Sequence, residues 1–505
     1  MEKYQAVYDL LLDAEKRFGG RTVIIEDDNE VTYSEMKRNS FKLANVLYDL
    51  GLKRGDKAAV YLPNRKEYFY IYYACFITGI IVVPIDFYLS EEEVINISDH
   101  CGAKLIFAES NPRCNLANLR YQSKSIKFIV SLDSQPQFLS FNNLLERASE
   151  DFKKVEIELD NYSSIFYTSG STGKPKGVVW NYRHIHIGSN SMDFFLRNHV
   201  QDQRAISAIP MSHSGGVLFP MLAIKMGLST VILERFHPLN FLKLVEKWKV
   251  SLFWIVPPMW YALLYLKEIE KFDLSSVKLA AVFGASSDPD LIRRSQKYMS
   301  EAKVINGWGM TEVIPPTTIG EPNFLETVGR PYPWVTLKIS GEDGVEKNVG
   351  EIGEIWAKGE AVFLGYYNEP ELTAQVFEDG WFKTGDLAKA DKDGNIYIVG
   401  RSKDMLKVGG QIVWCAEVEH TLLKHPCVKE AAIAGAPDKL RGEVPVAFIV
   451  LKEGIVLPKK YIIEFLQEHL AKFKIPKEVK YLEELPKSGT GKIDKGKLKE
   501  MAAAL

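Results

Sequence analysis

The sequence predicts an α/β protein with a large N-terminal domain and a smaller α+β C-terminal domain. Short apolar runs alternate with helical patterns from Thr22 to Ile305, which is typical of parallel βαβ sheets. From Gly329 onward shorter strands separated by Gly and Asp turns predict a small β-rich subdomain. A chain of 505 residues also exceeds the usual size of one hydrophobic core, so we expect at least two domains.

The N-terminal domain opens on this alternation. The apolar stretches Thr22–Glu26 and Lys57–Tyr61 predict strands, and the spacing of apolar residues over 33–50 predicts a helix between them. Residues 68–78 are apolar enough for a buried helix, which we expect to turn at Gly79 into another strand. Further strands of the same kind are predicted at residues 80–83, 105–107, 205–209, 229–232, 252–256, 278–283 and 303–305.

The second half of the chain changes character. Strands at residues 354–358 and 396–399 belong to the predicted β-rich subdomain, and a boundary is expected near residues 400–403. We therefore predict an N-terminal domain of residues 1–401 and a C-terminal domain of residues 402–505. Helices or strands of the C-terminal domain are predicted at residues 416–423, 428–434, 446–451, 459–469 and 495–501.

Composition and charge indicate a globular protein that binds no nucleic acid. Hydrophobic residues make up 46% and charged residues 25% of the chain, and the formal net charge is −2. The five cysteines form no C-x-x-C pair, which favours free thiols in a reducing compartment. The N-terminus does not resemble a signal peptide, and the apolar segment 68–83 is too short to span a bilayer. These features predict a cytoplasmic protein without a transmembrane segment.

The segment 167–177 is the strongest functional signal. Glycines allow backbone N–H groups to approach a ligand, hydroxyls add neutral donors and lysines add positive charge, so the segment predicts a polyphosphate cradle. It is no P-loop, because Lys174 is followed by Pro175, which disfavours the helix that a P-loop lysine opens. The candidate phosphate-binding residues are Thr168, Ser169, Gly170, Ser171, Thr172, Gly173, Lys174 and Lys176.

Two further segments carry groups suited to a nucleotide. Trp308 stands between glycines and could stack on a purine, while Thr311 could donate to a phosphate and Glu312 offers hard oxygens for Mg²⁺. Asp386 follows a turn glycine and could accept both ribose hydroxyls. The plainer alternatives are a packed tryptophan and a turn-capping aspartate.

Together these segments resemble the adenylate-forming (ANL) superfamily, in its branch of acyl-CoA synthetases or AMP-dependent acid–CoA ligases. The resemblance spans roughly residues 20–500 and includes Gly365-Tyr366-Tyr367-Asn368 with Thr373 behind. It implies that the glycine- and hydroxyl-rich loop holds the β- and γ-phosphates of ATP. The other implied roles are adenine stacking by Trp308 with Asn306 and Gly307 beside it, α-phosphate contact by Thr311, magnesium binding by Glu312, and ribose binding by Asp386 and Arg401.

The same resemblance assigns roles in the C-terminal domain. Lys492, in the Pro-Lys-x-x-x-Gly-Lys-Ile pattern, would be the catalytic lysine that stabilises charge on the carboxylate and α-phosphate during adenylation. Lys403 falls at the hinge about which this mobile domain would rotate between two poses. Gly409, Gly410 and Glu417 match the loop of the thiol tunnel. Cys415 departs from the proline found in many relatives and could alter that loop.

The acyl pocket is predicted by resemblance from the segment 210–216. Its expected lining is His213, which we also place in the catalytic group, with Ser214, Gly284, Ala285, Ser286, Gly309, Met310 and Val313. Ser214 stands where amino-acid-activating relatives carry an Asp, and an unpaired buried ammonium would be costly, so an α-amino acid is disfavoured. Gly309, in place of a blocking Trp, favours an acid longer than acetate, and the absence of a cationic residue from the lining favours a monocarboxylic acid.

The resemblance thus implies an ATP-, Mg²⁺- and CoA-dependent ligase of medium- or long-chain fatty acids or aryl acids. An acyl-AMP forms first, and the thiol of CoA then takes the acyl group. The alternative is a ligase that loads an acyl-carrier protein in trans, and a luciferase-like oxygenase or a nucleotide-binding protein without catalysis is disfavoured. The acid, its chain length and the oligomeric state stay open.

Overall fold

A computed structural model of the chain describes residues 6–133, 135–169, 175–197, 204–283, 290–487 and 493–504. The chain is divided into two compact units. The N-terminal unit comprises Met1–Thr336 and Ala357–Phe382, and the C-terminal unit comprises Leu337–Trp356 and Lys383–Leu505. The predicted domain boundary after residue 401 stays a prediction.

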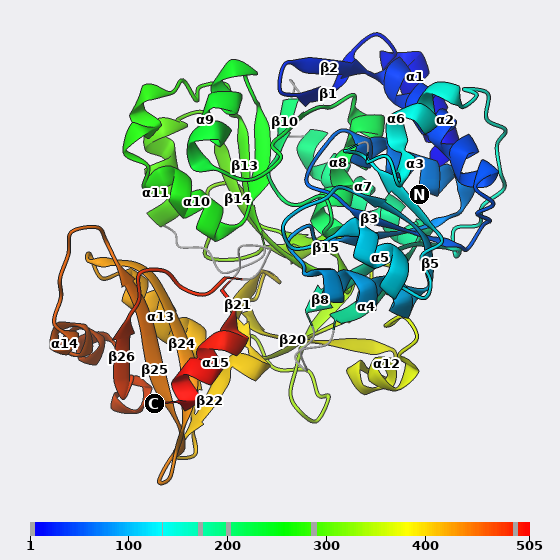
Figure 1. The fold of residues 1–505 in the computed structure, drawn as a ribbon. Coiled ribbons are helices and arrows are strands. Elements are labelled where there is room, and N and C mark those ends of the chain that lie inside the picture. Colours follow the sequence, from blue (N-terminus) through cyan, green and yellow to red (C-terminus); the bar gives the residue numbers. More distant parts are fainter. Residues whose placement is uncertain are drawn as a thin grey trace. The chain divides into compact units, whose positions relative to one another are not determined.

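Two largely parallel sheets form the framework of the N-terminal unit (Figure 1). Among the described residues the larger sheet has nine strands in the order β16-β15-β14-β13-β12-β10-β11-β1-β2, and the path from β14 to β1 is parallel throughout. Its strands are β1 (Thr22–Glu26), β2 (Asn29–Thr32), β10 (Arg204–Ser207), β11 (Ser229–Ile232), β12 (Leu252–Ile255), β13 (Leu279–Phe283), β14 (Lys303–Met310), β15 (Val313–Ile319) and β16 (Arg330–Pro331).

The second sheet has the order β7-β6-β5-β3-β4-β8-β9 and is parallel except for its last pair, β8 and β9. Its strands are β3 (Lys57–Tyr61), β4 (Ile81–Ile85), β5 (Ala103–Ala108), β6 (Phe128–Ser131), β7 (Leu139–Ser140), β8 (Tyr162–Ser169) and β9 (Pro175–Asn181). Because β4 is buried along its whole length and parallel to both neighbours, its carboxyl end is a natural place for functional groups.

Most helices of the N-terminal unit connect parallel strands of one sheet as crossovers, although α1 precedes the first strand. Helix α3 (Glu67–Thr78) is buried along its whole length and ends at Gly79, whose φ of 74° is the left-handed conformation that closes a helix. The other helices are α1 (Val7–Phe18), α2 (Tyr33–Asp49), α4 (Glu91–Cys101), α5 (Leu116–Gln122), α6 (Phe141–Arg147), α7 (Tyr182–Arg197), α8 (Ser214–Met226), α9 (Pro238–Lys247), α10 (Pro257–Leu264), η1 (Lys267–Lys271), α11 (Asp290–Tyr298) and α12 (Pro370–Val376).

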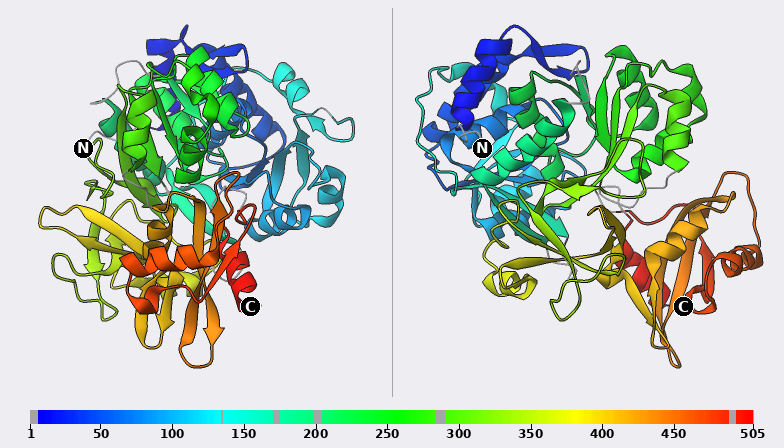
Figure 2. Two further views of the ribbon diagram at one scale, coloured as in Figure 1. Left: turned by 90° about the vertical axis from the view of Figure 1, so that its left-hand side faces the viewer. Right: turned by 180° about the vertical axis from the view of Figure 1, so that it is seen from behind.

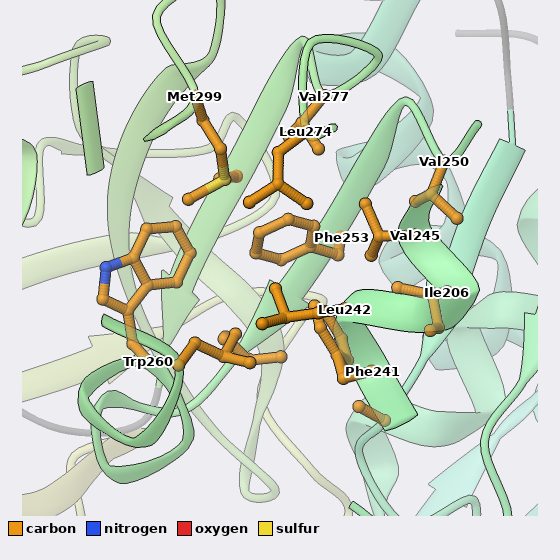
Figure 3. Close-up of a cluster of buried hydrophobic side chains, with 14 of the residues drawn as sticks. Ile206, Phe241, Leu242, Val245, Val250, Phe253, Trp260, Leu274, Val277 and Met299 are labelled. Carbon is orange, nitrogen blue, oxygen red and sulfur yellow. The ribbon is translucent and has the colours of Figure 1, made fainter. Parts of the chain in front are cut away.

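One hydrophobic core lies between the larger sheet and helices α9, α10 and α11 (Figure 3). Phe253 on β12 packs edge-on against Phe241 of α9, with ring centroids 5.2 Å apart, and also contacts Trp260 of α10. The Trp260 indole N–H donates to Ser295 Oγ at 3.0 Å, which satisfies the one polar group of this fully buried side chain. This core fixes the strands whose carboxyl ends lead toward the candidate site.

A small β-rich region follows. Strands β17 (Thr336–Ser340), β18 (Gly353–Lys358), β20 (Trp381–Ala390) and β19 (Phe377–Glu378) pair in that order, and β21 (Ile396–Arg401) pairs with β20. The division between the two units falls inside β17, β18 and β20.

The rest of the C-terminal unit is an α+β layer structure. Its sheet contains β22 (Met405–Val408), β23 (Gln411–Trp414), β24 (Val428–Asp438), β25 (Gly442–Leu451) and β26 (Glu478–Tyr481), accompanied by η2 (Ser402–Asp404), α13 (Cys415–Leu423), α14 (Lys459–His469), η3 (Lys472–Lys474) and α15 (Lys495–Ala503). On β24, Ala431 and Ile433 face the core beside α13 and α14, while Ala432 and Ala434 face the core beside α15. Because successive side chains of a strand point to opposite faces, both faces of the sheet are buried along β24. Figure 2 shows the β24–β25 hairpin, in orange, extending from the C-terminal unit.

The predicted fold class is confirmed, and most predicted strands lie within two residues of the observed bounds. One difference concerns β14, which was expected to end at Ile305 but continues to Met310. The two glycines of the added stretch let neighbouring chain segments approach the strand closely. The five cysteines, all within the described residues, are free. No described helix is both long enough and apolar enough to cross a membrane.

Candidate active site

The β8–β9 hairpin frames the predicted phosphate loop. The two strands are antiparallel, and Thr168 lies opposite Lys176. Gly177 lies opposite Tyr167 in this hairpin. A Cβ at this position would come within 2.9 Å of Ile165 Cγ2, which explains why a glycine stands there. Ser169 is the last residue of β8. Gly170, Ser171, Thr172, Gly173 and Lys174 lie outside the described residues.

The predicted adenine-binding segment lies within β14. Gly307 is required there because a Cβ would lie 2.2 Å from Phe283 Cε1, on the neighbouring parallel strand. The Trp308 backbone N–H donates to Thr318 Oγ1 at 3.2 Å, and the residue is only 7% exposed. Asn306 is buried, donating from Nδ2 to Leu325 O and accepting the N–H of Gly307, so its amide serves the local backbone.

Thr311 and Glu312 form the turn between β14 and β15 and are held by contacts from several segments. The indole N–H of Trp180 donates to Thr311 O at 2.8 Å. The hydroxyls of Ser214 and Thr311 lie 3.1 Å apart, which joins the predicted acyl pocket to the predicted phosphate contact. Glu312 is 9% exposed, and its Oε1 accepts the hydroxyl of Tyr366 at 3.2 Å.

His213 precedes α8 and faces a largely buried carboxylate. Its Nε2 lies 3.5 Å from Oδ2 of Asp86, the first residue after β4. Burial alone would raise the pKa of Asp86, but His213 and the backbone N–H of Tyr88 lower it below its usual value on balance. An ionised Asp86 therefore faces His213, the residue before Ser214.

The remaining predicted pocket residues divide into two groups. Met310 and Val313 pair across the β14–β15 turn, and Val313 is fully buried. A Cβ on Gly309 would lie 2.9 Å from Pro315 Cα, so close packing of β15 also accounts for this glycine, apart from any effect on pocket size. Gly284, Ala285 and Ser286 lie outside the described residues.

In the C-terminal unit, the predicted ribose-binding pair is already in contact. Asp386 and Arg401 are paired across β20 and β21, with Arg401 Nε 2.7 Å from Asp386 Oδ1. Asp386 is 5% exposed, whereas the Arg401 side chain is 47% exposed. Gly385, which was expected in a turn, lies within β20 with φ of 74°, and it donates its N–H to Glu354 Oε1 at 2.7 Å, which fixes the backbone before Asp386.

The other predicted residues of the C-terminal unit have clear local roles. Gly409 and Gly410 form a two-residue hairpin loop between β22 and β23, and both have positive φ, as such a tight turn requires. Glu417 forms an ion pair with Lys474 at 2.6 Å. Lys403 lies in η2, and its carbonyl accepts the ammonium of Lys499 at 3.0 Å. Lys492 lies outside the described residues.

Comparison with known proteins decides the family. Residues 11–367 match the AMP-binding enzyme family, and residues 417–492 match the AMP-binding enzyme C-terminal domain. The chain belongs to the AMP-binding enzymes. The resemblance inferred from the motifs is thus confirmed, and so is the enzyme class, an AMP-forming acid–thiol ligase.

Three relatives cover nearly all of this AMP-binding enzyme. It is 30% identical over 539 residues to a long-chain-fatty-acid–CoA ligase of Bacillus subtilis (strain 168), covering 98% of this chain and 94% of that protein. Its fold is similar to the crystal structure of the anthranilate CoA ligase AuaEII in complex with anthranoyl-AMP, with a TM-score of 0.92, 26% identity, and coverage of 100% and 98%. It is also similar to O-succinylbenzoate coenzyme A synthetase (MenE) of Bacillus subtilis in complex with ATP and magnesium ion, with a TM-score of 0.84, 27% identity, and coverage of 97% and 99%.

Two residues near the site of this AMP-binding enzyme were not selected from the sequence. Asp86 could have been found as a polar residue directly after a fully buried parallel strand. Tyr366 stood in a recognised motif, but no local pattern connects it with Glu312, 54 positions away. The described contacts bring the hydroxyls of Ser214 and Tyr366 to the turn that carries Thr311 and the buried Glu312 carboxylate, which suits binding and orientation of a phosphorylated carboxyl group.

Proposed function

We propose that the protein is an ATP-dependent acyl-CoA ligase that activates a monocarboxylic acid as its acyl-adenylate and transfers the acyl group to the thiol of CoA. The observation that carries this proposal is the 3.1 Å contact between Ser214 and Thr311. It brings the segment assigned to the acid to the residue assigned to the α-phosphate, the two groups that must react.

The chemistry requires such proximity. A carboxylate lacks a good leaving group until it is joined to AMP, when pyrophosphate departs. A thiol can then displace AMP. Holding the two reactants in fixed geometry supplies a large part of the rate enhancement, and neutral hydroxyl donors at Thr311 and Ser214 can bind phosphate and carboxylate oxygens without neutralising the nucleophile.

Magnesium is the implied metal, and the residues fit it. Mg²⁺ is commonly bound by one or two carboxylates together with substrate phosphates, and the buried Glu312 supplies one carboxylate at the turn. No cluster of three or more His, Cys, Asp or Glu side chains that could enclose a metal occurs in the described part of the chain. When bound with ATP, the ion would neutralise phosphate charge; Glu312 would hold it.

We assign the other predicted residues as follows. Residues 168–174 and Lys176 hold the β- and γ-phosphates, Trp308 with Asn306 and Gly307 contacts adenine, and Asp386 with Arg401 binds the ribose. Lys492 is the adenylation lysine, Lys403 the hinge, and Gly409, Gly410 and Glu417 belong to the thiol tunnel. The closeness of Asp386 and Arg401 supports their shared assignment, because they can present an acceptor and a donor to one sugar.

The acid is proposed to be a medium- or long-chain fatty acid or an aryl acid. The names of relatives support both classes, since one is a long-chain-fatty-acid–CoA ligase and another an anthranilate CoA ligase. The Asp86 carboxylate beside His213 would repel a second carboxylate on the substrate, which favours a monocarboxylic acid.

The test is a screen of pyrophosphate release with ATP and Mg²⁺ over C2–C18 fatty acids and benzoate-type acids, with CoA present. The expected result is release that depends on the acid and yields AMP and an acyl-CoA in equal amounts. Acyl-AMP that accumulates with CoA but is consumed by an acyl-carrier protein would contradict CoA as the acceptor. No release with any acid would contradict the proposal as a whole.

A further inference from the structure

An irregular segment connects the β8–β9 hairpin, which frames the predicted phosphate loop, with the β14–β15 turn, which carries Thr311 and Glu312. This linking segment, residues 361–367, contains no helix and no regular strand. On one side it follows β9: Tyr367 N–H donates to Gly177 O at 2.7 Å, and Val179 N–H donates to Gly365 O at 3.1 Å. On the other side it follows the β14–β15 turn, where Phe363 N–H donates to Glu312 O at 2.9 Å.

The linking segment therefore connects the base of the phosphate loop to the carboxylate proposed for magnesium. Backbone hydrogen bonds are directional, and several of them along one segment fix its position relative to both neighbours.

Tyr366 is the side chain of this segment that faces both groups. Its hydroxyl donates to Glu312 Oε1 at 3.2 Å, and the Lys176 ammonium lies 5.3 Å from the centre of its ring. Its backbone N–H donates to Thr373 Oγ1 at 2.9 Å. Contacts at the ring, the hydroxyl and the backbone leave the phenol little freedom to rotate.

The hydroxyl can act only as a donor toward an ionised Glu312. A tyrosine hydroxyl keeps its proton at neutral pH, so the phenol of Tyr366 can donate to the carboxylate oxygen 3.2 Å away. A carboxylate has acceptor sites on both oxygens, and the hydrogen bond at Oε1 restricts the rotation of the whole group. Carboxylates that bind metals are generally oriented by such hydrogen bonds.

We propose that Tyr366 is a positioning residue that orients the Glu312 carboxylate for the divalent metal ion carried by the nucleotide. The inference rests on the proposed function, in which Glu312 is the magnesium ligand. It predicts that Tyr366 acts through Glu312 alone, and that removing its hydroxyl weakens metal binding without changing the affinity for the acid.

The test compares Tyr366→Phe with Tyr367→Phe in the full-length protein. Both variants lose one phenolic oxygen from neighbouring positions, but the Tyr367 ring lies near Lys57, 5.5 Å away, and has no described contact with Glu312. Binding of Mn²⁺ in the presence of ATP is titrated by electron paramagnetic resonance, and the Mg²⁺ concentration for half-maximal pyrophosphate release is measured in parallel. Thermal transitions confirm that both variants are folded.

Tyr366→Phe should weaken Mn²⁺ binding on the order of tenfold, the lower end of the usual cost of losing a hydrogen bond to a metal ligand. Tyr367→Phe should bind Mn²⁺ like the wild type. In a Glu312→Ala background, Tyr366→Phe should cause no further loss, because the carboxylate that accepts its hydroxyl is gone. The KM for the acid should be unchanged in Tyr366→Phe.

Equal Mn²⁺ affinity in the wild type and Tyr366→Phe would overturn the inference, as would equal losses in both tyrosine variants or a full additional loss in the Glu312→Ala background. The proposed function fails separately, if the wild type releases no pyrophosphate with any acid. The Mn²⁺ titration does not depend on that release, so the two failures are distinguishable.

Discussion

His184 should make the N-terminal unit sensitive to mild acid. This histidine on α7 is 2% exposed, and burial lowers its pKa from 6.5 to about 4. Its Nδ1 accepts the backbone N–H of Asn181 at 3.0 Å, so the neutral ring carries its proton on Nε2, which donates to Val362 O at 2.9 Å. Protonation would place a second N–H against the Asn181 N–H and put a charge in the core.

The magnitude follows from linkage. Because the folded pKa is lower than the unfolded pKa, the unfolded chain binds more protons between pH 6.5 and pH 4, and stability falls as the pH falls through this window. A gap of about 2.5 between the two pKa values corresponds to about 3.4 kcal/mol in total, at 1.36 kcal/mol for each pKa unit. About 2 kcal/mol of this should be lost between pH 7 and pH 5.

The assay is urea unfolding of the wild type and His184→Gln at pH 7 and pH 5. Glutamine keeps a donor for Val362 but does not titrate, so the fall in unfolding free energy between the two pH values should be smaller by about 2 kcal/mol in the variant. His186, also buried with its pKa lowered to about 4, should leave some acid sensitivity in both proteins. Identical pH dependence in the two proteins would refute the reasoning.

Three further predictions concern other regions. Lys492→Ala should abolish acid-dependent pyrophosphate release but largely spare thioester formation from supplied acyl-AMP, and equal loss in both assays would contradict its assignment. Gly216→Ala should lower the thermal midpoint by several degrees because its Cβ would lie 2.4 Å from a backbone Cα, whereas Gly215→Ala, with open space around it, should not. Lys495→Met should cost about 2–3 kcal/mol in urea unfolding, because it leaves the largely buried Glu419 carboxylate without its cationic partner. Lys459→Met, which breaks the exposed pair with Glu478, should cost less than about 1 kcal/mol. Similar losses in the two variants would show that burial does not set the strength of these pairs.

The fold could be predicted from the sequence where local patterns determine it. The alternation of apolar strands and helices indicated the parallel sheets, and Gly79 marked the end of α3 correctly. The strand predicted over residues 303–305 continues to Met310, although it includes two glycines, which weaken strand propensity. Those glycines instead accommodate Phe283 and Pro315, which belong to neighbouring strands. A glycine in a strand indicates that another segment packs closely against the strand there, but the sequence alone does not show which segment it is.

The partners of the candidate site residues could be predicted from the sequence even less well. Motifs identified Thr311, Glu312 and His213 because each belongs to a short pattern. Asp86 lies 3.5 Å from His213, but the two residues are far apart in the sequence. Asp86 follows β4 and His213 lies between β10 and α8, so only the tertiary fold brings them together. Side-chain contacts between distant segments leave no periodic pattern in the sequence, which is why Asp86 and Tyr366 were not selected as site residues, whereas residues within short motifs were.

The burial of Glu312 gives a physical reason for its partners. A carboxylate that is 9% exposed loses most of its hydration, and the hydrogen bond from Tyr366 compensates a part of that loss. A divalent ion bound with ATP would compensate far more, so the carboxylate gains most when nucleotide and metal arrive together. Trp180 and Phe363 fix the turn that carries Glu312 by donating hydrogen bonds to the backbone carbonyls of Thr311 and Glu312. The turn therefore needs little further ordering when the nucleotide binds.

Replacing Trp180 with Phe should therefore weaken ATP binding while leaving the Glu312 carboxylate itself intact, because the indole N–H that donates to Thr311 O would be lost. Calorimetric titration with ATP and Mg²⁺ measures this directly, and unchanged affinity in a folded variant would show that the turn is held well enough without it.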